Sequence, residues 1–422
     1  MLTYKKTTLA NGLRLITVPH KDSLAVTVLV LVEAGSKYET KEINGLSHFL
    51  EHMCFKGTTN RPKAIMISSE LDGIGSAYNA FTGQEYTGYW AKATPQHLDQ
   101  LIEIVSDLYL NPIFEQAEIE KEKGVIIEEI NMYEDLPPRK VEEVLQELMY
   151  GDEPAGWPIA GRKEIIRKLG RDDFLKYRGQ HYLAPATIVV MAGNFEEDAA
   201  IKKLAKAFAK MKVAKKFGKE KTKEKQTQPA IKVFEKKSDQ SHIAIGCRAF
   251  DIFDGRKYAL DVLADALGGS MSSRLFEKVR NDLGAAYYVR AETGYQSDIG
   301  ALVVRAGLDN SRLGLVTEAI LVEMARFTKE KLSPEELQKA KDHLSGNFIL
   351  ELETSDALAT FYGGQEVITK KIETPEEILK KVRAVTADDV LAVAKEVISN
   401  QRLNFALVGP SSQNLKDVVS LG

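Results

Sequence analysis

The spacing of apolar residues predicts strands and helices that alternate along the chain. Residues 25–32 form an unbroken apolar run rich in β-branched residues, which is typical of a buried strand. Apolar residues recur at helical spacing in 95–110 and again in 115–134. Between these segments, two short strands in 78–91 are joined by a turn that contains Gly83. The pattern therefore predicts a mixed chain of strands and helices.

The second half of the chain repeats this order of elements. Strands return at 231–233 and 242–247, and Gly284-Ala285-Ala286-Tyr287 echoes Gly75-Ser76-Ala77-Tyr78. A helix opens at 332–336 in the same way as at 114–118. An internal repeat at this scale predicts a duplication of roughly two hundred residues.

A lysine-rich segment separates the two repeats. Residues 209–230 are rich in lysine, and large apolar residues vanish after Phe217, which is typical of an inter-domain linker. A charged surface helix without a boundary role is the alternative. We expect one domain at 1–210, a charged linker at 211–230 and a second domain at 231–422.

Composition narrows the class of protein. The chain has 422 residues, 44% of them hydrophobic, and a net charge of −3, so we expect more than one domain and no nucleic-acid partner. The two cysteines, Cys54 and Cys247, form no disulfide framework. No apolar run approaches the length of a membrane span and no signal peptide is recognisable. We expect a cytoplasmic protein without a membrane partner.

The pentapeptide His48-Phe49-Leu50-Glu51-His52 carries the strongest chemical signal. At about 100° per residue, a helix places both histidines and Glu51 on one face, opposite Leu46 and Met53. Two imidazoles one turn apart are a common pair of zinc ligands, and a carboxylate between them can act as a base. The alternative is that the two histidines and Glu51 lie on the solvated surface of a helix and bind no metal.

A third zinc ligand has two sources in the sequence. Glu118, Glu122 and Glu129 share one face of the helix predicted at 115–134, although such a row is also typical of a solvated acidic face. Cys54 follows the pentapeptide closely, but its helical direction lies about 160° from that of His52. The acidic row is the better candidate.

The second repeat lacks this chemistry. The stretch that corresponds to the pentapeptide helix, 258–264, contains no histidine, and the counterpart of Glu129 is Asn347. We therefore expect one metal site per chain, in the first half.

Together these residues resemble the M16 metallopeptidases, also called pitrilysin-like peptidases or inverzincins. The family's H-x-x-E-H motif is followed, 77 residues after its second histidine, by a glutamate, and here that position is Glu129. Residues 75–89 are similar to the family's N-A-x-T strand, and 268–276 to its G-G-x-x-S-S-R-L-F segment. Arg280 and Tyr287 match its Arg/Tyr pair. The chain length resembles the subfamily of mitochondrial processing peptidase and its bacterial relatives.

The resemblance implies an α+β fold made of two similar domains, each a mainly antiparallel sheet with helices on one face. It implies one Zn²⁺ per chain, held by His48, His52 and Glu129. Glu51 would be the general base, and Glu122 would orient a ligand or the water.

The resemblance also implies how a substrate binds. An extended peptide would pair with the edge strand at Asn79 and Ala80, and Arg280 and Tyr287 would donate to its carbonyl or oxyanion. A surface arginine and a core tyrosine are the alternative for this pair. Two chains would form a homodimeric clamshell around a chamber, or one chain would close on itself.

The predicted function is a zinc endopeptidase that cleaves peptides. A processing peptidase for a specific precursor and an inactive scaffold subunit are the alternatives within the family. A metal-binding protein that is not a peptidase is a further alternative, but no residue pattern in the sequence supports it.

Overall fold

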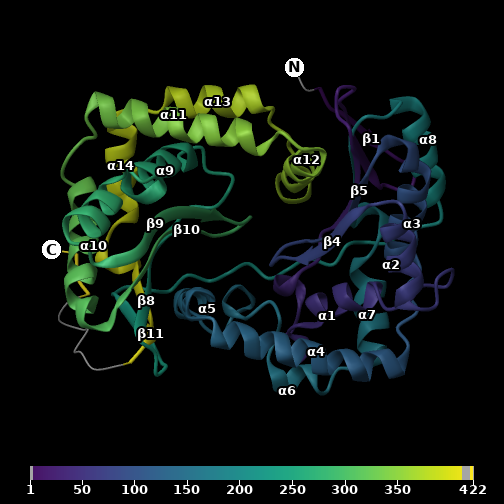
Figure 1. Cartoon of the computed structure of the whole chain (residues 1–422), viewed down its shortest axis with the longest axis horizontal. Helices are drawn as coiled ribbons and strands as arrows, with labels where there is room; N and C mark the ends of the chain where they lie inside the picture. The colour runs from purple at the N-terminus through teal and green to yellow at the C-terminus, as the bar shows by residue number, and fades with distance from the viewer. Residues whose placement is uncertain (1–2, 411–418, 422) are drawn as a thin grey trace. The chain divides into compact units, whose positions relative to one another are not determined.

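The computed structural model describes residues 3–410 and 419–421. These residues form two compact units, shown with the chain coloured from end to end in Figure 1. Unit 1 comprises Met1–Ile130, Trp157–Glu220 and Leu350–Ile372. Unit 2 comprises Asn131–Gly156, Lys221–Ile349 and Glu373–Gly422. The outer ends of the two expected domains, at residues 1–2, 411–418 and 422, lie outside the described residues.

Unit 1 is built on a six-stranded sheet in the order β1-β2-β6-β3-β5-β4. All neighbouring pairs are antiparallel except β2 and β6, which are parallel. The apolar run of the sequence is the central strand β3, whose residues are all buried. The strands are β1 (Lys5–Thr8), β2 (Arg14–Pro19), β3 (Val26–Val32), β4 (Ala77–Thr82), β5 (Thr87–Ala93) and β6 (Thr187–Gly193).

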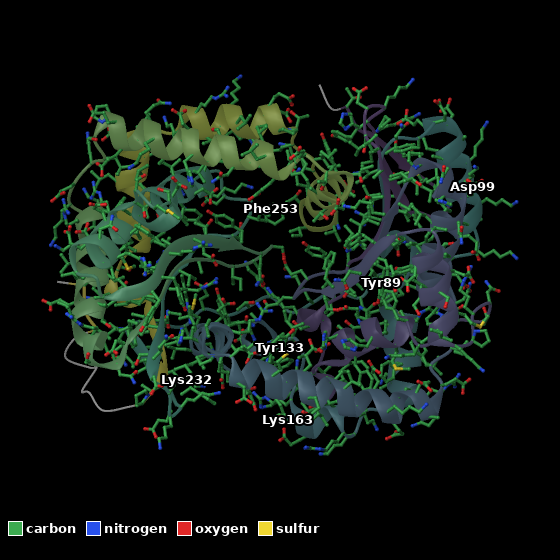
Figure 2. The ribbon with its side chains drawn as sticks, in the orientation of Figure 1. Tyr89, Asp99, Tyr133, Lys163, Lys232 and Phe253 are labelled. Carbon is green, nitrogen blue, oxygen red and sulfur yellow. The ribbon has the colours of Figure 1, made fainter. Side chains whose placement is uncertain are left out.

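Helices cover the face of this sheet to which Val26, Val28, Val30 and Val32 point. Tyr89 on β5 belongs to the same core and is fully buried (Figure 2). These helices are α1 (Leu46–Cys54), α2 (Ala64–Gly73), α3 (Leu98–Leu110), α4 (Gln116–Asp135), α6 (Lys163–Ile166), α7 (Arg171–His181) and α8 (Glu197–Phe208).

Unit 2 repeats this plan with a five-stranded sheet in the order β7-β11-β8-β10-β9. Its one parallel pair, β7 and β11, matches the β2 and β6 pair of unit 1. The strands are β7 (Ala230–Glu235), β8 (Gln240–Ala249), β9 (Ala286–Tyr295), β10 (Gly300–Asp309) and β11 (Leu403–Gly409). The helices are α9 (Lys257–Ala264), α10 (Leu313–Phe327), α11 (Pro334–Glu351), α13 (Pro375–Ala384) and α14 (Ala387–Val397), with the π-helical turns Asp265–Gly269 and Phe276–Asp282. The predicted duplication and the predicted α+β class are confirmed.

The second face of each sheet is contacted by a helix from the other half of the chain. Helix α12 (Ser355–Thr369) packs against β3 and β6 of unit 1. Gly363 permits this close contact, because a Cβ there would lie 2.7 Å from Leu31 and 2.8 Å from Val190. Helix α5 (Pro137–Tyr150) packs against β8 and β11 of unit 2 and buries Val141 and Val144. The compact units are thus discontinuous in sequence, unlike the expected domains.

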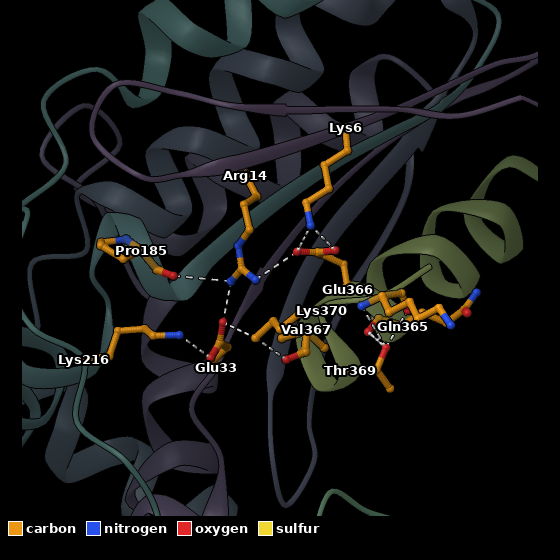
Figure 3. A network of polar contacts seen from close by, with 11 residues as sticks. Lys6, Arg14, Glu33, Pro185, Lys216, Gln365, Glu366, Val367, Thr369 and Lys370 are labelled. Carbon is orange, nitrogen blue, oxygen red and sulfur yellow. Dashed lines mark hydrogen bonds and ion pairs between the residues drawn. The ribbon is translucent and has the colours of Figure 1, made fainter. Parts of the chain in front are cut away.

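A network of charged side chains fixes α12 on its sheet (Figure 3). The carboxylate of Glu366, 1% exposed, accepts hydrogen bonds from Arg14 at 3.0 Å and from Lys6 at 2.8 Å. Arg14 also pairs with Glu33, which in turn pairs with Lys370 at the end of α12. Loss of the cationic partners would leave the charge of Glu366 buried and unpaired, which is strongly destabilising. The network therefore favours this position of α12 on the sheet.

The predicted linker makes polar contacts with both units. Lys216 pairs with Glu33 at 2.9 Å, and Lys219 pairs with Glu85 at 2.8 Å, both within unit 1. In unit 2, the Thr222 amide donates to Asp298 at 2.9 Å. Residues 211–228 form neither helix nor strand.

Among the residues that the structure describes, no helix has the length and apolar character to cross a membrane.

Helices α5 and α12 each pack on the sheet of the other half of the chain. This arrangement, the exchange of α5 and α12, predicts that the two halves stay together after a cut in the linker. A cleavage site for a specific protease can be inserted between Glu220 and Lys221. Cleavage there gives two fragments, of which the first carries α5 and the second carries α12. Burial of a single Val, Leu or Met side chain contributes about 1.5–3 kcal/mol, and each helix buries several. We expect the cut fragments to co-elute in gel filtration and to separate in denaturant. Separate elution in native buffer would contradict the exchange.

Candidate metal centre

The N-terminus of α1 is fixed by a buried carboxylate. Glu39, 5% exposed, accepts hydrogen bonds from the amides of Gly45 at 2.8 Å and Ser47 at 2.6 Å, which satisfies donors that a helix start leaves open. Burial raises the pKa of Glu39 to about 7, against these hydrogen bonds. Gly45 has a φ of 97°, and a Cβ there would lie 2.7 Å from Gly161. These contacts set where α1 begins.

The burial of α1 follows the predicted faces. Leu46, Phe49, Leu50 and Met53 are at most 1% exposed, and they pack in the core of unit 1. His48, Glu51 and His52 are partly exposed. The predicted orientation of the pentapeptide is confirmed, and its three polar side chains share the face that the core does not cover.

Helix α4 brings a carboxylate to both imidazoles. Ile119, Ile126 and Ile130 bury one side of α4, and Glu129 then lies with its Oε2 3.6 Å from His48 Nε2 and 3.5 Å from His52 Nε2. The three ligand atoms all lie within 4.8 Å of one another. Ligands of one tetrahedral Zn²⁺ at about 2.0–2.1 Å are about 3.3 Å apart. Two imidazoles and a carboxylate at this spacing fit a zinc ion.

Glu122 orients one of the two imidazoles. Its Oε1 lies 2.9 Å from His52 Nδ1, and its Oε2 lies 2.7 Å from Lys56 Nζ. A proton on His52 Nδ1 directed to this carboxylate leaves the lone pair of Nε2 for a metal. Burial alone would raise the pKa of Glu122, but the hydrogen bonds with His52 and Lys56 outweigh it and lower the pKa. Glu122 is only 4% exposed, so it is not part of a solvated acidic face.

The two histidines differ in their acid–base behaviour. Burial, with the neighbouring His52, lowers the pKa of His48 to about 4. Burial also acts to lower the pKa of His52, but Glu122, Glu129 and Glu51 together outweigh it and raise the pKa. His48 is therefore a neutral imidazole near pH 7. A metal must displace a proton on Nε2 of His52, whereas the Nδ1 proton can remain in the hydrogen bond to Glu122.

Glu51 lies beside this cluster without belonging to it. Its Oε2 accepts a hydrogen bond of 2.6 Å from Thr82 Oγ1, at the end of β4. Burial raises the pKa of Glu51, and the hydrogen bond from Thr82 opposes that rise. A carboxylate that is close to the cluster, but held by a different partner, has the arrangement of a general base.

Cys54 does not join the cluster. It is fully buried, its Sγ lies 3.6 Å from the Tyr89 hydroxyl, and burial raises the pKa of its thiol to about 12. A thiol in such surroundings is not a zinc ligand, because the thiolate is the form that binds. Among the described residues, the group that can hold a metal is His48, His52 and Glu129.

Asn79 and Ala80 lie on β4, which is the edge strand of its sheet. The Ala80 amide donates a hydrogen bond to Asn79 Oδ1 at 2.9 Å, and β4 pairs with β5 alone among the described strands. This edge is therefore open to an added strand once the Asn79 side chain moves aside.

Arg280 and Tyr287 belong to unit 2, where they lie next to each other. Arg280 Nη1 donates to the carbonyl oxygens of Ala286 at 2.7 Å and Tyr287 at 2.8 Å. Tyr287 is 58% exposed, so it is not a core tyrosine. Arg280 thus holds the start of β9, and the Tyr287 side chain projects from it.

Three residues of this site were not identified from the sequence. Glu39 and Lys56 flank the pentapeptide, but neither has a spacing that marks a contact. Thr82 had a signal, since it is the threonine of the N-A-x-T segment and strand alternation places it on the same face as Ala80, but no role was predicted for it.

Comparison with known proteins gives the family. Residues 15–163 match the model described as insulinase (peptidase family M16), and residues 168–344 match the model described as peptidase M16 inactive domain. An uncharacterized zinc protease, YmxG, of Bacillus subtilis (strain 168) is 34% identical, with 96% of this chain and 98% of the relative covered. An uncharacterized zinc protease of Streptomyces coelicolor is 32% identical over 97% of this chain and 90% of its own.

A solved structure agrees with the fold. The crystal structure of a protease from Helicobacter pylori has a TM-score of 0.90 at 23% identity, and the match covers 97% of this chain and 100% of that one. Sequence relatives above 30% identity extend over nearly the whole chain. The chain belongs to the insulinase family of peptidases, family M16.

Proposed function

We propose that this protein is a zinc-dependent endopeptidase that cleaves peptides or short unfolded segments. The observation that carries the proposal is the convergence of His48 Nε2, His52 Nε2 and a Glu129 oxygen within 4.8 Å, with the Glu51 carboxylate beside them. The names of the relatives as zinc proteases support the choice of metal.

In this proposal His48, His52 and Glu129 hold the zinc ion, and Glu122 orients His52. Bound zinc supplies a Lewis acid that makes water more acidic and polarises a carbonyl. Glu51 takes the proton of the attacking water and passes it to the leaving amine, as a general base that then acts as acid. The second oxygen of Glu51 is open for that proton, because Thr82 donates to Oε2.

The substrate binds as an extended strand along β4. Main-chain hydrogen bonds at Asn79 and Ala80 give affinity with little dependence on side chains. Arg280 and Tyr287 supply donors for the peptide carbonyl or the oxyanion as charge develops. The exposure of Tyr287 is consistent with this role, since its side chain is accessible to a ligand.

An inactive scaffold subunit and a processing peptidase for one precursor are the competing functions. The complete set of two histidines, a third ligand and a base speaks against the scaffold. The inactive-domain match covers residues 168–344, which lie outside the pentapeptide and Glu129. Digestion of a peptide library, read by mass spectrometry, distinguishes a broad peptidase from a precursor-specific one.

We propose further that the enzyme is a homodimer in which Arg280 and Tyr287 of one chain serve the zinc site of the other. The alternative, a single chain closed by a flexible linker, needs residues 209–230 to move freely. The ion pairs of Lys216 and Lys219 within unit 1 and the amide contact of Thr222 within unit 2 leave little free length.

We expect Glu51→Gln to retain zinc and to lose activity. The ligand set is unchanged while the proton acceptor is removed, and general base catalysis commonly contributes roughly 10²–10⁴-fold. Hydrolysis of a quenched fluorescent peptide and metal analysis of the same sample measure both properties. Glu128→Gln, an exposed neighbour of Glu129 on α4, is the control. Activity of Glu51→Gln within a few-fold of wild type would refute the assignment, and loss of zinc would make Glu51 a ligand.

We expect Glu129→Gln to weaken zinc binding more than Glu122→Gln. The first change removes a bond to the metal, whereas loss of a residue that orients a ligand typically costs roughly 10–100-fold in affinity or activity. Zinc retained after dialysis against a graded chelator gives the order. Glu118→Gln, on the same helix and paired with Lys121, should leave zinc unchanged. The reverse order would exchange the roles of Glu122 and Glu129.

We expect mixed subunits to recover activity. Glu51→Gln and Tyr287→Phe are purified separately, mixed and allowed to exchange. In a shared site, a heterodimer keeps one intact set, with Glu51 from one chain and Tyr287 from the other. Activity per heterodimer should then approach about half of wild type, as an isologous two-fold pair requires. No recovery, with exchange demonstrated by labelled chains, would mean that each chain completes its own site.

A further inference from the structure

The hydrogen bond between Thr82 and Glu51 joins two parts of the site that the proposed function treats separately. Thr82 is the last residue of β4, the edge strand, and Glu51 lies on α1. Thr82 Oγ1 donates to Glu51 Oε2 at 2.6 Å, a short distance typical of a hydroxyl bound to a charged acceptor. Among the described residues, Thr82 is the side chain that donates a hydrogen bond to Glu51.

Strand geometry explains why Thr82 reaches this carboxylate. Side chains on a strand alternate between its faces, and Tyr78 and Ala80 pack against the core that also contains α1. Thr82 shares their face and therefore points toward α1. Phe81 points the other way and meets Gly88 across the strand pair.

The same strand therefore offers its free edge at Asn79 and Ala80 and a hydroxyl to Glu51. We propose that Thr82 is a positioning residue that holds the Glu51 side chain in the orientation needed for proton transfer. This inference rests on the proposed peptidase function and assigns to Thr82 a role distinct from binding either metal or peptide. A glutamate side chain has three rotatable bonds and loses substantial freedom when it is held, and Thr82 does this by fixing one oxygen and leaving the other open.

The test compares Thr82→Val with Thr82→Ser. Valine keeps the β-branched shape that suits a strand but removes the hydroxyl, whereas serine restores the hydroxyl. We expect kcat of Thr82→Val to fall about 10–100-fold, in the range of lost orienting contacts, with KM within about twofold and zinc content unchanged. Thr82→Ser should recover kcat to within a few-fold of wild type.

The neighbouring strand supplies a matched control. Thr87 lies directly opposite Thr82 in the β4–β5 register, is fully buried, and donates to the carbonyl oxygen of Ala34 at 2.9 Å. Thr87→Val makes the same chemical change without touching Glu51. We expect it to lower the melting temperature and to leave kcat within a few-fold of wild type.

A second measurement does not depend on activity. Melting temperatures of zinc-free wild type, Thr82→Val, Glu51→Ala and the double variant form a cycle. If the hydroxyl acts through Glu51, Thr82→Val should lower the melting temperature when Glu51 is present and change it less in Glu51→Ala. Equal shifts in both backgrounds would overturn the contact.

The outcomes separate this inference from the proposed function. Cleavage by Thr82→Val at the wild-type rate would overturn the role of Thr82 alone. A loss of kcat that serine does not restore, or that Thr87→Val matches, would mean a structural role and would also overturn it. Absence of cleavage by zinc-loaded wild type would overturn the proposed function, and this inference with it.

Discussion

The packing of α1 into the core of unit 1 is the constraint on which the site depends. Phe49 and Leu50 are completely buried, and a helix that buries this face must present the opposite one. His48, Glu51 and His52 must therefore lie on the face of α1 that points away from the core. Glu39 fixes where the helix starts and so sets its rotation about its own axis. The ligand geometry is thus decided mainly by apolar burial, and the polar contacts of Glu122 and Thr82 refine it.

Helix α4 depends on the same principle. Its buried isoleucines direct Glu122 and Glu129 toward α1, where one carboxylate meets His52 Nδ1 and the other meets both Nε2 atoms. Carboxylates beside an apolar stripe are costly to bury without partners, and each of these has partners across the helix pair. The two helices therefore specify each other, and a bound metal ion would complete the balance of charge between the imidazoles and the carboxylates.

Much of this arrangement follows from the sequence. The faces of α1 and the central strand β3 follow from periodicity within single segments, and the duplication follows from the order of segments that both halves share. The structure agrees with each. The proposed ligand role of Glu129 needed the family resemblance, since an acidic row alone is as typical of a solvated surface. The contacts of Glu39, Lys56 and Thr82 depend on segments brought together by folding, which local spacing does not encode. The exchange of α5 and α12 was missed for the same reason, because sequence order suggests continuous domains.

Unit 2 has the same plan of strands and helices as unit 1, but its described residues include no set that could hold a metal. In the region that corresponds to the metal cluster, His343 Nδ1 lies 2.6 Å from Asp265, and its Nε2 lies 3.0 Å from the amide nitrogen of Asn347. Both ring nitrogens are thereby engaged by neighbouring side chains. In unit 1, Glu122 engages only the Nδ1 of His52, and the Nε2 atoms face an acceptor at 3.5–3.6 Å, too far for a hydrogen bond of ordinary strength. At this position of the fold, the side chains of two neighbouring helices can either hydrogen-bond to one another, as in unit 2, or leave their ligand atoms available to a cation, as in unit 1. In unit 2 the amide of Asn347 stands where unit 1 has the carboxylate of Glu129, and residues 258–264 supply no histidine. This region of unit 2 is therefore closed by hydrogen bonds between side chains and, within the part of the chain that the structure describes, has no set of groups that could hold a metal.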